Sequence, residues 1–489
     1  MGEIQDTLFP LESNRSVKVR AEADSALTLN AGALLLREIG ERLGLWSMLE
    51  RGLYDARDGH RITHPFMELV RTVVLLAAQG WSRLSDADFL RRDAAMRLAV
   101  SKRKGESPLL PRRHAREPEG LASQPTLSRL LTALSTPRNR SAITGVLCSW
   151  AAYRQGLSVE QPCDELTLDL DSLPHEVHGE QAGSAYNAHY HCRCFHPLVV
   201  SWELGDFLGA RLREGNVHTA DDALDFVLPY LDWASAFTRQ LWVRMDAGFP
   251  EDAVLSTLEA RGYRYVARLK TNARLERLAW SHVDRVALKA KPEERIHTIE
   301  LRYGAQAWCR RRRVVLVIDE RPLELMPRYF FLITNAPRQE VSGGQLLERY
   351  RRRGVAEKDY GDWLKALDLA LSSTNRPKES YRGRTPRERS EPVDSFAVNE
   401  ATLLLSMLTA NLLHSARHLV EKSHDHRWSR ETFRMHVLQG AARVARSARY
   451  VTFWIEHTRA QYWHAIGQQL KKLQPARGSP LRLALPSPT

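Results

Sequence analysis

The sequence lacks the features that would place the protein in a membrane or outside the cell. Its longest purely apolar run, Val73–Ala78, is far shorter than the roughly 20 residues that cross a bilayer. The first residues, Met-Gly-Glu-Ile-Gln-Asp, include early acids and no apolar core, so we expect no secretory signal. Five cysteines in 489 residues, an odd number, argue against a disulfide framework. These absences favour a cytoplasmic protein.

Several catalytic signatures are also missing. The sequence contains no Walker A loop, no dinucleotide-type glycine motif and no clear Ser/His/Asp triad. What it does contain is positive charge, since 71 Lys and Arg against 58 Asp and Glu give a net charge of +13. Such a balance favours a polyanionic partner, most often nucleic acid, although a ribosome-associated or membrane-surface protein would also fit.

One short stretch, Leu166–Pro174, carries two acids at the end of a predicted strand. Apolar residues alternate there with Thr167, Asp169 and Asp171, which is the period of a strand, and the proline ends it. Asp169 and Asp171 therefore project from one face. Burying both without compensation would be costly, so they either lie at a solvated strand end or hold a cation.

Two further acids follow at suggestive places. Asp246 ends a second predicted strand, Leu241–Met245, and functional carboxylates commonly lie at the carboxyl ends of strands in α/β sheets. Glu357 stands in a predicted helix, where Tyr350, Arg353 and Glu357 share one face. The alternative for Arg353 and Glu357 is a surface ion pair.

Three carboxylates from scattered positions suit Mg²⁺, with Mn²⁺ as its substitute, because these hard ions take oxygen ligands. Two such ions about 4 Å apart activate a water or a 3′-hydroxyl and stabilise the leaving oxygen in phosphoryl transfer. This chemistry needs no Ser/His/Asp triad.

Periodicity and composition predict six parts of the chain. A long helix is expected at 342–370, and further helices at 395–420 and 430–446. We expect a disordered N-terminus at 1–23, a helical DNA-binding region at 24–150 with a basic linker at 101–120, an α/β core at 151–270 and 341–392, a β-rich insertion at 271–340, a C-terminal helical region at 393–473 and a disordered tail at 474–489.

Candidate DNA contacts lie in three basic or polar stretches. The predicted helix Leu121–Ala133 exposes Ser128 and Arg129, as a recognition helix does, although any capped amphipathic helix looks similar. The other candidates stand in charge runs, which contact a DNA backbone or are simply solvated: Arg310, Arg311, Arg312 and Arg349.

The stretch His189–His196 contains two cysteines and three histidines and so invites a zinc assignment. Its one-residue spacings do not match the two-to-four-residue loops of structural zinc sites. We therefore favour a loop and strand with incidental thiols.

Taken in order, these motifs resemble those of the DDE transposases of bacterial insertion sequences over roughly 25–460. The motifs that carry the resemblance are Leu168-Asp-Leu-Asp-Ser, His178-Gly-Glu-Gln-Ala-Gly, Tyr186-Asn187, His196-Pro197-Leu198, Met245-Asp246-Ala-Gly-Phe, the Tyr350, Arg353 and Glu357 arrangement, Leu121–Leu130, and Ser395-Phe-Ala-Val-Asn-Glu-Ala-Thr-Leu-Leu-Leu. The resemblance implies a ribonuclease H-like α/β core with an inserted β-rich subdomain, flanked by helical regions.

The resemblance also implies roles for individual residues. Asp171, Asp246 and Glu357 would be the catalytic, metal-binding carboxylates, with Asp169 a supporting neighbour at most. By their own chemistry, Arg353 would supply a phosphate contact and Tyr350 a hydroxyl and a stacking face beside a nucleic-acid backbone. The lysine that the family places seven positions after the glutamate is displaced by one here, to Lys365, which turns it about 100° around the helix.

The implied activity is that of a transposase. It would bind terminal inverted repeats in double-stranded DNA, cut them with Mg²⁺ and join 3′-hydroxyl ends to target DNA, as a homodimer in the DNA complex. The alternatives are a metal-dependent nuclease of the same fold without strand transfer and a catalytically inactive DNA-binding remnant.

Overall fold

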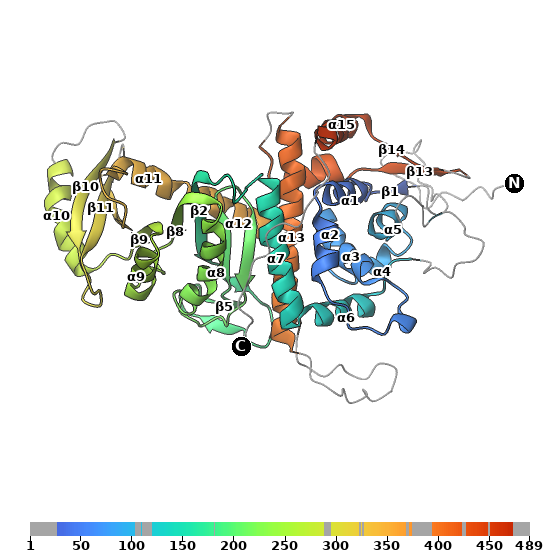
Figure 1. Cartoon of the computed structure of the whole chain (residues 1–489), viewed down its shortest axis with the longest axis horizontal. Helices are drawn as coiled ribbons and strands as arrows, with labels where there is room; N and C mark the ends of the chain where they lie inside the picture. Colours follow the sequence, from blue (N-terminus) through green and yellow to red (C-terminus); the bar gives the residue numbers. More distant parts are fainter. Residues whose placement is uncertain are drawn as a thin grey trace, which may run out of the picture.

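The computed structural model in Figure 1 describes residues 27–102, 109, 120–179, 181–287, 295–321, 324, 327–367, 371–373, 394–422, 427–447 and 450–472. The predicted disordered N-terminus (1–23), the disordered tail (474–489) and most of the basic linker (101–120) lie outside these residues.

A mixed sheet of eight strands forms the centre of the protein, in the order β10-β11-β12-β9-β8-β2-β6-β7. The strand predicted at 166–171 is confirmed as β2 (Cys163–Ser172), and β2 pairs in parallel with β8 (Thr238–Met245). On its other side β2 pairs antiparallel with β6 (Leu198–Trp202), which continues to β7 (Phe207–Arg211). The architecture is a mixed α/β fold consistent with a ribonuclease H-like core.

The β-rich segment extends this sheet instead of forming a sheet of its own. β9 (Arg264–Leu269) lies parallel to β8 and antiparallel to β12 (Arg328–Thr334), which leads to β11 (Arg312–Glu320) and β10 (Arg295–Tyr303). The segment also contains a helix that we did not predict, α10 (Ala273–Ala287). Its apolar residues Leu275, Ala279 and Val283 recur at helical spacing and are buried, so the signal was present in the sequence.

Alternation along β2 decides which side chains face which layer. Leu166, Leu168 and Leu170 point into the apolar layer that includes α8 (Ala223–Ser235) and α9 (Asp252–Ala260). Asp169 and Asp171 point to the opposite face, where α11 (Gly343–Arg351) and α12 (Arg353–Leu367) lie. The acids therefore meet the helices that carry Tyr350 and Glu357.

The single helix predicted at 342–370 is interrupted. Arg352 ends α11, and α12 begins at the next residue, beside Gly354, a poor helix former. A capping box of Ser342 and Gln345 fixes the start of α11. Residues 368–370 lie outside the described residues.

A long buried helix, α13 (Ser395–Glu421), stands between the sheet and the N-terminal helices (Figure 1). By length and composition it is the one helix in the described ranges that is apolar enough to cross a membrane, but 83% of that apolar window is buried inside the protein. The helices that surround it or complete the helical region are α1 (Gly32–Arg42), α2 (Leu45–Gly52), α3 (Phe66–Gln79), α4 (Asp86–Phe89), α5 (Ala94–Val100), α6 (Gln124–Leu134), α7 (Pro137–Arg154) and α15 (His457–Lys472).

The helix predicted at 430–446 is wrong over most of its length. Only α14 (Arg430–Phe433) and a π-helical turn, Arg434–Leu438, are helical, and β13 (Ala442–Arg446) follows. From Ala442 to Ala445 buried and exposed side chains alternate, which is the period of a strand. β13 forms a three-stranded sheet with β1 (Leu27–Thr28) and β14 (Val451–Ile455).

A second small sheet, in the order β3-β5-β4, follows β2. It consists of β3 (His175–Glu176), β4 (Ala185–Asn187) and β5 (Cys192–Phe195). The turn between β4 and β5 contains Tyr190, which lies near the carboxylates described next.

Candidate active site

Asp171 lies one residue before the end of β2, on the face of the sheet that α12 covers. The residue is 4% exposed. Its Oδ1 accepts a hydrogen bond of 2.9 Å from the backbone N–H of Ser172, and its Oδ2 lies 2.8 Å from Nη2 of Arg353. The carboxylate is thus held from two sides in a nearly water-free position.

Asp246 directly follows β8, the parallel neighbour of β2. Leu170 pairs with Met245 across the two strands, so Asp171 and Asp246 leave the sheet at the same edge. The backbone N–H of Gly248 donates to Oδ1 of Asp246 at 2.7 Å. The negative charge of Asp246 raises the pKa of Asp171, so the two predicted carboxylates are electrostatically coupled.

Glu357 is connected to Asp171 through Arg353. Nη1 of Arg353 lies 2.5 Å from Oε1 of Glu357, while Nη2 holds Asp171. The side chain of Arg353 is 11% exposed and that of Glu357 is 53% exposed. Arg353 and Glu357 therefore do not form an isolated surface pair, because the guanidinium bridges to a buried aspartate of the sheet.

The electrostatics of the site follow from this burial. Burial, and to a smaller extent the charge of Asp246, raise the pKa of Asp171 to about 7, against the lowering effect of Arg353. Burial alone would lower the pKa of Arg353, but the charges of Asp171, Tyr350 and Glu357 raise it overall. The site thus disfavours negative charge unless a cation accompanies it.

The oxygen donors suit a hard cation by their chemistry. Asp171 and Glu357 are separated by the guanidinium of Arg353, and no three His, Cys, Asp or Glu side chains among the described residues are close enough together to hold a metal ion. A metal ion between Asp171 and Glu357 therefore requires Arg353 to move. The predicted residues supply the oxygen ligands that Mg²⁺ prefers, and the position of the Arg353 side chain decides whether they can approach one ion together.

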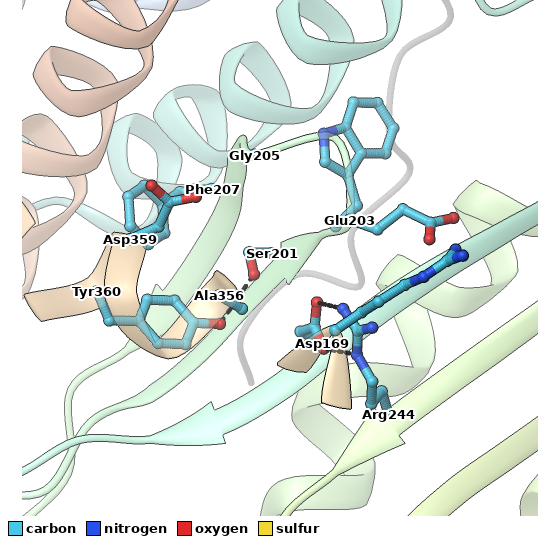
Figure 2. Close-up of a pocket in the computed structure, with 11 residues that line it drawn as sticks. Asp169, Ser201, Glu203, Gly205, Phe207, Arg244, Ala356, Asp359 and Tyr360 are labelled. Atoms are coloured by element: carbon cyan, nitrogen blue, oxygen red, sulfur yellow. Dashed lines mark hydrogen bonds and ion pairs between the residues drawn. The ribbon is translucent and has the colours of Figure 1, made fainter. Parts of the chain in front are cut away.

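Asp169 has a different partner, as Figure 2 shows. Its two carboxylate oxygens lie 2.5 and 2.7 Å from Nε and Nη2 of Arg244 on β8, and both side chains are 2% exposed. Arg244 also donates to the backbone oxygen of Arg349, which ties β8 to α11. This pair borders a cavity of about 190 Å³ that also includes the hydrogen-bonded Ser201 and Tyr360. Asp169 is thus engaged in a structural ion pair.

The sequence analysis missed two aromatic side chains at the site. Tyr190 is half-buried, and burial together with the charges of Asp246 and Asp171 raises its pKa. Its ring contacts that of His196, whose Nδ1 lies 3.1 Å from the carbonyl oxygen of Val217. Because a carbonyl only accepts, Nδ1 carries the proton and Nε2 is an acceptor. That Nε2 is buried without a partner among the described residues. The His-Pro-Leu motif was the available signal.

The predicted DNA contacts next to Glu357 are partly engaged within the protein. Tyr350 is half-buried, stacks at an angle on Phe330, and burial raises its pKa. Arg349 pairs with Glu165 through contacts of 2.6 and 2.9 Å and lies over the ring of Trp242. Lys365 on α12 is exposed.

The remaining predicted contacts fall into two groups. Arg312 is buried and bonded to Asp252 and Glu259, so its guanidinium holds α9 against β11 and is not exposed in this structure. Arg310 also pairs with Glu259, and Arg311 is exposed. Ser128 and Arg129 lie on α6, along a groove of about 1160 Å³ between α3, α6 and α13.

The comparison with protein families agrees with this geometry. The family model described as "Transposase DDE domain group 1" matches residues 9–477, nearly the whole chain. No curated protein matches the chain. The extent of the match shows the family, and the chain belongs to the DDE transposases.

Proposed function

We propose that this DDE transposase cuts DNA at the terminal inverted repeats of its element and transfers the 3′-hydroxyl ends to target DNA. Asp171, Asp246 and Glu357 are the catalytic carboxylates in this proposal, and Mg²⁺ or Mn²⁺ is the cofactor. The core that carries them is ribonuclease H-like, with the β10–β12 segment as its insertion.

One observation supports this function above the others. Two aspartates end adjacent parallel strands, and a glutamate from a helix is joined to the first of them through a single arginine. A purely structural role would not need two further acids beside Asp171, because a buried carboxylate costs desolvation energy when it is ionised and neighbouring negative charges add to that cost.

The residues would divide the work as follows. Asp171, Asp246 and Glu357 would hold Mg²⁺, which when bound supplies the positive charge that activates the nucleophile and stabilises the leaving oxygen. Hydrogen bonds from the backbone of Ser172 and Gly248 orient the two aspartates before substrate arrives. Once displaced from the carboxylates, Arg353 would pair with a DNA phosphate, because a guanidinium donates bidentate hydrogen bonds to phosphate oxygens.

DNA recognition and assembly belong to the same proposal. Ser128 and Arg129 on the groove of α6 would contact the DNA ends, together with Tyr350, Arg349 and the exposed Arg311. We also propose a homodimer in the DNA complex, and we assign residues 24–150 to DNA binding and 393–473 to a C-terminal helical region.

The test is Mg²⁺-dependent cleavage of a duplex that carries the terminal repeat. Replacing Asp171, Asp246 or Glu357 by Ala should each abolish cleavage and leave DNA binding largely intact. Asp164→Asn, which removes a carboxylate that is 88% exposed, is the control and should cleave normally. A single site variant that cleaves at the wild-type rate refutes the assignment of that residue.

The same reaction separates the alternatives. Joined products in the presence of target DNA are expected from a transposase and not from a nuclease of the same fold. A protein that binds the ends and never nicks them with Mg²⁺ or Mn²⁺ is an inactive remnant.

A further inference from the structure

Arg353 is a single side chain that contacts two of the three proposed catalytic carboxylates at once. Its Nη2 lies 2.8 Å from Oδ2 of Asp171, and its Nη1 lies 2.5 Å from Oε1 of Glu357. A guanidinium can bridge two acids in this way because its donors lie in one plane in a fixed fork. The protein's own cation therefore binds the oxygens that a hard metal ion would need.

Arg353 and a metal ion would compete for the same acids. Both oxygens of Asp171 are engaged, Oδ1 by the backbone N–H of Ser172 and Oδ2 by Arg353. A guanidinium that stays between the two carboxylates also repels a divalent cation placed beside it, because like charges repel. Strong metal binding by Asp171 and Glu357 together therefore depends on where the Arg353 side chain lies.

The burial of Asp171 means that Arg353 cannot leave it without a replacement. The residue is 4% exposed, so water screens its charge poorly. Removing one partner of a buried ion pair leaves the other charge uncompensated, which is strongly unfavourable. The carboxylate therefore exchanges one cation for another and is not left without one.

The guanidinium needs a second anion when it leaves Asp171, and the helix junction around it carries the positive charge that attracts one. Arg353 is the first residue of α12, directly after Arg352 ends α11. Arg351 and Arg352 are exposed there and form no ion pair within the described part of the chain. Glu357 is 53% exposed, so its end of the bridge borders solvent. A phosphate that reaches this junction can accept Arg353, because guanidinium groups pair with phosphate as well as with carboxylate.

We propose that Arg353 is an internal counter-ion that keeps the metal affinity of the carboxylates low until a DNA phosphate binds its guanidinium. This inference rests on the proposed function, in which DNA and Mg²⁺ or Mn²⁺ meet at Asp171 and Glu357. The coupling is reciprocal, since DNA that raises the affinity for metal is itself bound more tightly, by the same factor, when metal is present. Arg353 thereby restricts metal binding, and with it cleavage, to protein that already holds DNA.

A merely structural role for Arg353 predicts a different result. If the arginine only fastened α12 to the sheet, replacing it would loosen the site and weaken metal binding. If it is an internal counter-ion, replacing it strengthens metal binding in the protein without DNA, because Asp171 and Glu357 lose a competing cation. The sign of the change in metal affinity separates the two roles.

The test is the affinity of the full chain for Mn²⁺, measured from the electron paramagnetic resonance of free Mn²⁺, with and without a duplex that carries the terminal repeat. The duplex is precut at its 3′ end so that no cleavage occurs, and the Mn²⁺ bound by the duplex alone is subtracted. DNA should tighten Mn²⁺ binding by the wild type about 10- to 100-fold. Arg353→Gln without DNA should bind Mn²⁺ about 10- to 100-fold more tightly than the wild type, and DNA should then add less than about 5-fold.

The matched control is Arg313→Gln. Arg313 is 14% exposed, pairs with both carboxylate oxygens of Glu300 and lies on β11, which β12 and β9 separate from β8. This control should bind Mn²⁺ as the wild type does, weakly alone and more tightly with DNA. A second variant, Arg353→Lys, keeps one positive charge but has no fork that bridges two carboxylates, so its Mn²⁺ affinity without DNA should be intermediate. It replaces the glutamine variant if circular dichroism shows that the latter does not fold.

The outcomes distinguish this inference from the proposed function. A folded Arg353→Gln or Arg353→Lys protein that binds Mn²⁺ no more tightly than the wild type overturns the inference, as does a wild type whose Mn²⁺ affinity is the same with and without DNA. An equal gain of affinity in Arg313→Gln would show a general charge effect and would also overturn it. A wild type that binds no Mn²⁺ even with DNA refutes instead the carboxylate site of the proposed function.

Discussion

Asp171→Asn should make the protein more stable while it removes the cleavage activity. The carboxylate of Asp171 is buried, and its pKa is raised from 3.8 to about 7. At neutral pH and above, this rise makes the ionised form about 4 kcal/mol less favourable in the folded protein than in the unfolded chain. Asparagine keeps the shape and removes the charge, so up to about 4 kcal/mol of stability should return.

The sign of the pH dependence follows from the direction of the pKa change. Because the folded pKa of Asp171 is raised, the folded protein binds more protons than the unfolded chain between about pH 4 and pH 7. The stability of the wild type therefore falls as the pH rises through that window. The advantage of Asp171→Asn should be near zero below pH 4, about 2 kcal/mol at pH 5 and constant above pH 7.

The assay is urea unfolding followed by tryptophan fluorescence at pH 5, 6, 7 and 8 in a buffer with EDTA. Asp164→Asn, which removes a carboxylate that is 88% exposed, serves as the control and should show a small difference from wild type at every pH. The reasoning fails if Asp171→Asn is less stable than the wild type at pH 8, or if its advantage is the same at pH 5 and pH 8.

Three further predictions concern the surroundings of the site. Arg244→Met should destabilise the protein by about 3–5 kcal/mol, because it leaves Asp169 charged and buried, and adding Asp169→Leu should recover most of that loss in unfolding experiments. Arg312→Gln should cost a similar 3–5 kcal/mol and leave the salt dependence of DNA binding unchanged, whereas a flatter slope would restore its role as a DNA contact. Gly248→Ala should slow cleavage about 10- to 100-fold with DNA affinity retained, since a methyl group there would lie 2.6 Å from Cγ2 of Thr219 and 3.1 Å from Oδ1 of Asp246, so that the loop must shift; a wild-type rate would show that the loop tolerates the shift.

The periodic part of the fold could be predicted from the sequence. β2 follows a simple alternation, and β8 contains a short run of large apolar residues with Asp246 directly after it. The existence of both strands and the placement of Asp171 and Asp246 at their ends therefore needed no tertiary knowledge. The long apolar stripe of α13 was equally clear. These elements are long or strongly patterned, and local pattern is then sufficient.

What failed depended on partners that are distant in the sequence. Asp169 and Asp171 are equivalent in the sequence pattern. Their roles differ because Asp169 pairs with Arg244 of the neighbouring strand, whereas Asp171 pairs with Arg353 of α12. Arg312 reads as part of a basic run, yet α9 supplies the acids that bury it. The prediction of a helix over 430–446 is wrong at β13 because this strand is defined by its pairing with β1 and β14. Charge pairing and sheet pairing across long separations are not visible in a window of sequence.

The central position of α13 also sets the order in which a newly made chain can fold. Helices α1, α3, α6 and α7 all pack on α13, yet they leave the ribosome first, and α13 ends at Glu421, roughly 270 residues after α7 at 5–20 residues per second. For about 13–54 s, the N-terminal helices wait with their apolar faces uncovered. During that interval the uncovered apolar surface favours aggregation, and a message cut before α13 yields N-terminal helices without the helix on which they pack.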